Sequence, residues 1–197
     1  MSVDVRQQIV AGAADLIRRR GLAGTSIRGL AEHAAAPLGS TYHYFPGGKQ
    51  QLAAEAVRFA GDQVSSTLRA ALDGGPVDGL RAFLALWRKI LTRADFRAGC
   101  PVLVVAVEEP AGDESAPREA AAEVFRAWEE LLADSLRAYG ADARDADELA
   151  TLVVAAVEGA VAMCRAQRDP RPLDRVAARL ELLIGDAVGD PSRPVAD

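Results

Sequence analysis

Residues 25–45 of the chain read TSIRGLAEHAAAPLGSTYHYF, and this stretch decides the fold. Thr25 or Ser26 suits the N-cap of a short helix over 27–34, whose apolar side chains recur at helical spacing. Pro37 disfavours helical geometry in the residue before it and can start a second short helix that ends near residue 45. Two short helices joined by a three-residue break predict a helix-turn-helix.

A longer packing helix is predicted ahead of this pair, from about Asp4 to Arg20. Its apolar residues fall on one face and are Val5, Ile9, Ala13, Leu16 and Ile17. Three arginines occupy the last turn, where cations suit the helix dipole, and Gly21 suits the position after the helix. The three helices together give a reading head of the kind that binds DNA.

The second helix of the pair has the composition that contact with DNA requires. Gly39, Ser40 and Thr41 keep its start narrow enough to approach base edges. The donors that can reach phosphates around it are Ser26, Arg28, Tyr42, His43, Tyr44 and Lys49. The alternative interpretation is three ordinary short helices that cap a core.

The charge distribution favours an anionic partner for the N-terminal end. The net charge of the chain is −5, yet residues 1–50 hold six basic and three acidic side chains. The other 147 residues hold 17 basic and 25 acidic groups. A basic end on an acidic body indicates that this end alone meets nucleic acid, unless the excess arose by chance.

Six more helices are predicted after the first three, over about 49–72, 77–94, 99–109, 116–139, 145–167 and 173–188. The acidic loop 110–117 is expected to be mobile, and the tail from Gly189 to be frayed. The predicted fold is therefore all-α. Its expected parts are a helix-turn-helix domain (1–48), a six-helix ligand-binding and dimerisation domain (49–189) and a flexible tail (190–197).

Several classes of protein are disfavoured. Two cysteines make no disulfide framework and fit a reducing cytoplasm, and no signal peptide or membrane span is predicted. His33 and His43 have no partners at metal-ligand spacing, so we expect no metal. No catalytic triad, phosphate loop or paired catalytic carboxylates is evident, so we expect neither an enzyme nor a cofactor.

Residues 9–57 resemble the DNA-binding domain of the TetR family of bacterial repressors. The resemblance rests on Ile9, Ala13, Gly21, Thr25-Ser26-Ile27-Arg28, Leu30-Ala31, Gly39-Ser40-Thr41-Tyr42-His43-Tyr44-Phe45, Lys49 and Leu52. The string from Gly39 through Pro46-Gly47-Gly48-Lys49, with Gly99-Cys100-Pro101 in mid-chain, looks like the LmrA/YxaF-like branch. The resemblance implies a repressor that binds a palindromic DNA operator as a homodimer. It also implies a small effector in an internal pocket, whose binding reorients the fourth helix and spreads the two reading heads.

By this resemblance, the residues that face DNA are Ser26, Arg28, Leu38, Gly39, Ser40, Tyr42, His43, Tyr44 and Lys49. Tyr42 and Lys49 would hold phosphates, and Ser40, His43 and Tyr44 would lie nearer to base edges. Two positions depart from the family's pattern. Ala35 stands where the turn usually has glycine, which costs about 1 kcal/mol if the position needs a positive φ. Leu38 replaces a polar or basic residue, so it can touch a thymine methyl group but cannot bond a phosphate.

The helices after the fourth collect most of the large side chains, which suit either a plain core or the pocket that the family implies. The candidate pocket residues are Phe83, Trp87, Phe96, Cys100, Leu103, Glu108, Phe125, Trp128 and Met163. The expected effector is small and largely apolar, with Glu108 as a possible polar anchor. Cys100 suits a sensor thiol at a helix N-terminus, although a small buried hydrophobe is the commoner role. We interpret Glu158 as structural.

The last two predicted helices carry apolar stripes that suit a four-helix bundle with a second copy. The candidate interface residues are Leu149, Leu152, Val153, Ala156, Ala160, Cys164, Val176, Leu180 and Leu183. Two other functions stay open at this point. An enzyme would need a nucleophile–base pair or a cofactor loop, and a helical ligand-binding dimer with a degenerate reading head is favoured only by Ala35 and Leu38.

Overall fold

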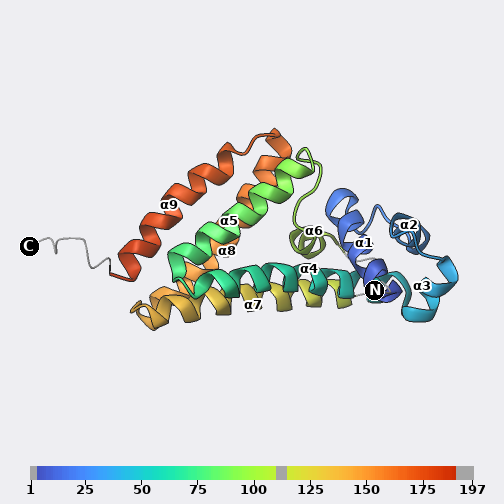
Figure 1. The fold of residues 1–197 in the computed structure, drawn as a ribbon, viewed down its shortest axis with the longest axis horizontal. Helices are drawn as coiled ribbons and strands as arrows, with labels where there is room; N and C mark the ends of the chain where they lie inside the picture. Colours follow the sequence, from blue (N-terminus) through green and yellow to red (C-terminus); the bar gives the residue numbers. More distant parts are fainter. Residues whose placement is uncertain (1–3, 110–114, 190–197) are drawn as a thin grey trace, which may run out of the picture. The chain divides into compact units, whose positions relative to one another are not determined.

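The protein is described by a computed structural model, in which residues 4–109 and 115–189 are placed. These residues form nine helices and no strand, as predicted. The helices are α1 (Val5–Arg20), α2 (Ile27–His33), α3 (Leu38–Tyr44), α4 (Gly48–Leu72), α5 (Pro76–Arg93), α6 (Pro101–Val107), α7 (Ala116–Ala138), α8 (Ala143–Gln167) and α9 (Arg171–Ala187) (Figure 1).

The helix ends follow local capping chemistry, so most lie within two residues of the predicted ends. The Asp4 carboxylate accepts the Arg6 N–H and caps α1, and Asp142 caps α8 through the Arg144 N–H. α5 has proline as its first helical residue. α7 begins at Ala116, inside the loop predicted over 110–117, and residues 110–114 and 190–197 lie outside the described residues.

The chain divides into two compact units that do not follow the predicted boundary between residues 48 and 49. One unit comprises Met1–Gln63 and Arg97–Phe125, and the other comprises Val64–Phe96 and Arg126–Asp197. The long helices α4 and α7 therefore contribute to both units. The boundary between residues 48 and 49 therefore stays a prediction of where the DNA-binding function ends and the ligand-binding and dimerisation functions begin.

In the first unit, α1 packs against α2, α3 and α6. Its core includes Ile9, Ile17, Leu30, Phe45 and Leu52, which are fully buried. The part of α4 in this unit also approaches α7 closely, since a Cβ on Gly61 would lie 2.5 Å from Val124 Cγ2. Glycine at this point of α4 therefore lets the two helices come together.

In the second unit, α9 packs on α5 and α8 (Figure 1). α8 has the length and apolar composition of a membrane-crossing helix. One side of α8 serves the core of this unit, because Val153, Val157 and Cys164 are fully buried in it. Ion pairs join the outer surfaces, such as Arg81 of α5 with Glu181 of α9 at 2.9 Å.

Candidate nucleic-acid interface

The helix-turn-helix begins with a capped α2. Ser26 is the N-cap, since its Oγ accepts the Gly29 N–H at 3.1 Å. Thr25, the other predicted cap, instead donates its hydroxyl to the Leu22 carbonyl at 2.8 Å and closes the loop before the helix. Both Ser26 and Arg28 are exposed, so the start of α2 presents a hydroxyl and a guanidinium to solvent.

The turn after α2 is a Schellman motif built on alanine. The Ala36 N–H donates to the Ala31 carbonyl, and the Ala35 N–H donates to the Glu32 carbonyl, each at 3.0 Å. Ala35 has φ 51°, which is the left-handed region that favours glycine. The positive φ considered from the sequence is therefore present, and the alanine here carries backbone strain.

α3 is anchored by its buried side and leaves its other side open. Thr41 and Phe45 are fully buried, and the Thr41 hydroxyl donates to the Pro37 carbonyl at 3.2 Å. Tyr42 is 52% exposed and His43 is also exposed. A short helix held in this way presents its open side as one rigid surface.

The nine residues predicted to face DNA all lie in the first unit and keep accessible surface. Ser26, Arg28, Gly39, Tyr42, His43 and Tyr44 are exposed, and Leu38, Ser40 and Lys49 are half-buried. The rings of His43 and Tyr44 meet edge to face with centroids 5.3 Å apart, which limits the orientations of both side chains. Their contacts with DNA stay a prediction.

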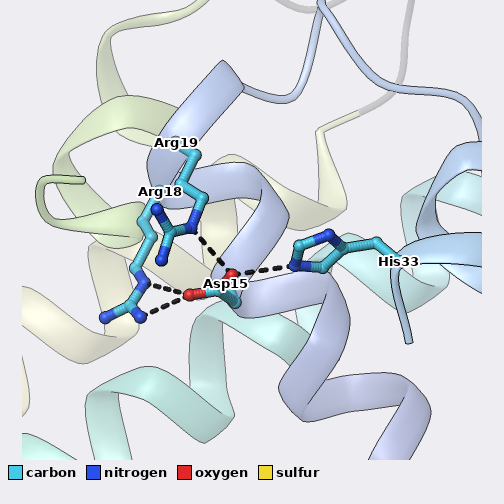
Figure 2. Close-up of polar contacts among 4 residues, drawn as sticks. All are labelled: Asp15, Arg18, Arg19 and His33. Atoms are coloured by element: carbon cyan, nitrogen blue, oxygen red, sulfur yellow. Dashed lines mark hydrogen bonds and ion pairs between the residues drawn. The ribbon is translucent and has the colours of Figure 1, made fainter. Parts of the chain in front are cut away.

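A charged cluster that the sequence analysis missed ties α2 to α1 (Figure 2). The Asp15 carboxylate accepts hydrogen bonds from Arg18 Nε at 2.8 Å and Arg19 Nε at 2.9 Å, and His33 Nε2 lies 2.8 Å away. Burial acts to raise the pKa of Asp15, but hydrogen bonds from Arg19, Arg18 and His33 outweigh it and hold that pKa well below its usual range. The spacing of Asp15 from the two arginines was a visible signal, whereas the contribution of His33 was not.

A second cluster joins the start of α4 to α1. Arg6 pairs with Glu55 at 2.5 Å, and its guanidinium lies 5.3 Å from the centroid of the buried Phe45 ring. The Gly47 N–H donates to Gln51 Oε1 at 2.9 Å and orders the loop before α4. The first turns of α4, which include Lys49, are thus held on the reading head, defined here as α1 to α3.

Two family descriptions match successive parts of the chain. Residues 9–56 match "Bacterial regulatory proteins, tetR family", and residues 76–179 match "Transcriptional regulator LmrA/YxaF-like, C-terminal domain". The chain belongs to the TetR family. It is a transcriptional regulator with a DNA-binding helix-turn-helix, of the LmrA/YxaF-like branch, as the resemblance implied.

Relatives and solved structures agree with this membership across nearly the whole chain. An uncharacterized HTH-type transcriptional regulator of Mycobacterium tuberculosis (strain H37Rv) is 43% identical over 95% of this chain and 98% of its own. The HTH-type transcriptional regulator LmrA of Bacillus subtilis is 30% identical over 92% of this chain and 97% of its own. The TetR-family regulator CifR, solved as a cysteine mutant with 26-bp operator DNA, is 25% identical, with a TM-score of 0.71 over 93% of this chain and 96% of its own.

The structure brings together three of the candidate pocket residues of this TetR-family chain. The ring of Phe83 meets Trp87 and Trp128 edge to face, with centroids 6.3 and 5.8 Å apart. These three side chains are almost completely buried in the second unit, which also contains the half-buried Phe96. Among the described residues, the Trp87 Nε1–H has no hydrogen-bond acceptor, which is unusual for a buried donor.

The other candidate pocket residues have different surroundings. Cys100, Leu103, Glu108 and Phe125 belong to the first unit. Cys100 is buried, and its Sγ accepts the Leu103 N–H at the start of α6. The Glu108 carboxylate accepts the backbone N–H groups of Leu22 and Ala23, so it already has partners within the protein.

Met163 was predicted to line the pocket, but its side chain does not lie in the interior. It is 51% exposed on α8, on the same face as Leu152, which is 46% exposed. Apolar stripes on opposite sides of one helix have the same spacing, so the sequence did not separate the inward stripe from the outward one.

The candidate interface residues fall on both faces of the last two helices. Leu149, Val153, Ala160, Cys164 and Leu180 are buried within the single chain, so they belong to its own core. Ala156 and Val176 are half-buried, while Leu152 and Leu183 are 46% and 44% exposed. The exposed apolar side of the pair also carries Ala155, Gly159, Ala162, Met163 and Leu182.

Proposed function

We propose that this TetR-family protein is a cytoplasmic repressor that binds a palindromic operator as a homodimer and releases it when a small apolar effector binds. The observation that carries DNA recognition is the open side of α3, where Gly39, Tyr42 and His43 are exposed while Thr41 and Phe45 are buried. Ser40, His43 and Tyr44 would approach base edges. Ser26, Arg28, Tyr42 and Lys49 would bond phosphates, while Leu38 would touch a thymine methyl group.

The exposed apolar stripe of α8 and α9 supports the dimer. Leu152, Gly159 and Met163 recur at helical spacing along the outer face of α8, and Leu182 and Leu183 lie on the outer face of α9. Small residues in such a stripe let helices approach closely, and a second copy would cover both stripes in a four-helix bundle. A two-fold axis through this bundle would match a palindromic operator.

The aromatic cluster of Phe83, Trp87 and Trp128 supports an effector of defined chemistry. An apolar ligand that enters beside these rings gains aromatic contact, and one acceptor atom on it would satisfy the Trp87 Nε1–H. We therefore propose a planar apolar molecule with a carbonyl or similar acceptor. A hundredfold loss of operator affinity requires about 2.7 kcal/mol of coupling, which a few such contacts can supply.

The experiment that tests this function is selection of a duplex from a random 30-bp library by the purified protein. A two-fold symmetric site, bound by two copies and protected from nuclease, is the expected result. Selection of an asymmetric site, or of no site, contradicts it. The Trp87→Phe variant then tests the effector, because a compound that releases DNA through the Nε1–H loses potency against this variant and not against Tyr139→Phe, a change of an exposed aromatic residue outside the candidate pocket.

A further inference from the structure

The carboxylate of Glu108 accepts hydrogen bonds from the backbone of the loop between α1 and α2. Glu108 Oε2 accepts the N–H of Leu22 at 2.9 Å and that of Ala23 at 2.8 Å, and Oε1 lies 3.1 Å from the Leu22 nitrogen. Hydrogen bonds to an ionised acceptor are about twice as strong as neutral ones. Glu108 directly follows α6 and lies 86 positions from Leu22, so these hydrogen bonds join two distant parts of the chain.

The loop is shaped to admit this carboxylate. Gly21 ends α1 with φ 78°, and a Cβ at this position would lie 2.2 Å from Glu108 Oε1. Any other residue would therefore collide with the carboxylate and also adopt a strained backbone. A second bond, from the Gly99 N–H to the Arg18 carbonyl at 3.0 Å, attaches the other end of the α6 segment to α1.

The residues that Glu108 holds lead directly to α2, at whose start Ser26 and Arg28 are predicted to face DNA. The Leu22 carbonyl accepts both the N–H and the hydroxyl of Thr25, and the next residue, Ser26, caps α2. A shift of Leu22 is thus passed through Thr25 to Ser26 and to the orientation of α2. Since Ala23 is exposed, water would satisfy its N–H without Glu108. What the carboxylate adds is the position of the loop.

We propose that Glu108 is a positioning residue for DNA binding. Its carboxylate holds the α1–α2 loop, and through it α2, in the orientation that binds DNA. Glu108 lies within the part of the chain that matches the family's C-terminal domain, while Leu22 and Ala23 lie within the matched DNA-binding domain. Displacement of α6 withdraws the carboxylate and lowers the affinity for DNA. This inference rests on the proposed operator recognition in one respect, since the selected duplex serves as the specific DNA probe in its test.

The direction in which a Glu108 substitution changes DNA affinity distinguishes a positioning role from electrostatic repulsion of the phosphates. Removing a negative charge near DNA strengthens binding, because phosphates are repelled less. Loss of a positioning contact weakens it. The test measures affinity for the selected duplex and for a random duplex in Glu108→Ala, in the isosteric Glu108→Gln, and in Glu109→Gln. The last is the matched control, since Glu109 is the exposed neighbour and its change removes the same charge.

We expect Glu108→Ala to bind the selected duplex about tenfold more weakly, Glu108→Gln to lie between it and the unchanged protein, and Glu109→Gln to bind equally or more tightly. Hydrogen exchange at the Leu22 and Ala23 amides should accelerate in both Glu108 variants while the thermal midpoint stays close to that of the unchanged protein. Gly21→Ala should weaken binding as well, and by a smaller factor in the Glu108→Ala background, where its Cβ meets no carboxylate.

The proposal is overturned if both Glu108 variants bind as tightly as Glu109→Gln, or if the two amides exchange at unchanged rates. Failure of the unchanged protein to select any duplex would instead contradict the proposed operator recognition. The exchange rates and the binding of random DNA then still decide the role of Glu108.

Discussion

His33 Nε2 lies 2.8 Å from Asp15 Oδ2, and this contact fixes the end of α2 against the middle of α1 (Figure 2). The same carboxylate accepts hydrogen bonds from Arg18 and Arg19. One acidic side chain thus satisfies three basic ones and orients the helix that leads into the turn of the helix-turn-helix. Its loss would leave Arg18, Arg19 and His33 without this shared acceptor.

We predict that Asp15→Asn lowers the free energy of unfolding by about 1–3 kcal/mol at pH 7, because charge-assisted hydrogen bonds are lost at a partly buried site. The pKa of Asp15 is lowered on folding from its ordinary value of 3.8, so the unfolded chain binds more protons. The contribution of Asp15 is therefore complete above about pH 5 and is lost as the pH falls below its ordinary pKa. Urea unfolding of both proteins across this range should show the difference narrowing at low pH. A difference that stays constant from pH 7 to pH 3 would contradict the role of the carboxylate.

We predict that Ala35→Gly raises the free energy of unfolding by about 0.5–1 kcal/mol. Relief of the left-handed strain at φ 51° outweighs the greater entropy that glycine gives the unfolded chain. Ala34→Gly is the matched control, since Ala34 has an ordinary helical φ of −75° and is buried, so this change should destabilise. Thermal and urea unfolding measure both. Equal destabilisation by the two changes would show that the turn is not strained.

The conformation of Ala35 was predictable because it depends on neighbours within a few residues. The same holds for the helices and their ends, which follow from apolar spacing and from local caps such as Asp4 and Asp142. The hydrogen bond between Glu108 and the Leu22 N–H was not predictable, because no local pattern links residues 86 positions apart. Periodicity also cannot distinguish the inward Val153 from the outward Leu152, since both lie on apolar stripes of α8.

We predict that Tyr42→Phe and Lys49→Ala weaken binding to all duplexes alike, by about threefold to tenfold, because phosphate contacts carry no sequence information. Tyr42 is 52% exposed and Lys49 is half-buried at the start of α4, so both can change without harm to the core. Lys49→Ala should also reduce the salt dependence of binding by about one unit, since one fewer counterion is released. Fluorescence anisotropy across a salt series measures this. A loss confined to the selected duplex, with random DNA unaffected, would assign these residues to base readout instead.

The last prediction concerns the dimer. Leu152→Glu and Leu183→Glu each place a charge on the exposed apolar stripe, where a second copy would bury it without a partner. We expect both variants to be folded monomers at micromolar concentration, with dimerisation weakened more than a hundredfold.

Multi-angle light scattering gives the mass, and circular dichroism checks that the helices are retained. Val107→Glu is the matched control, because Val107 is 73% exposed on α6, which belongs to the other compact unit, and its change should leave the dimer intact. The monomeric variants should also lose most of their affinity for a palindromic duplex while their weak binding of random DNA persists, because a single reading head contacts one half-site. If both stripe variants were still dimers, the interface would lie outside the exposed apolar stripe. If the unchanged protein were a monomer, it would lack the two-fold symmetry on which recognition of a palindrome depends.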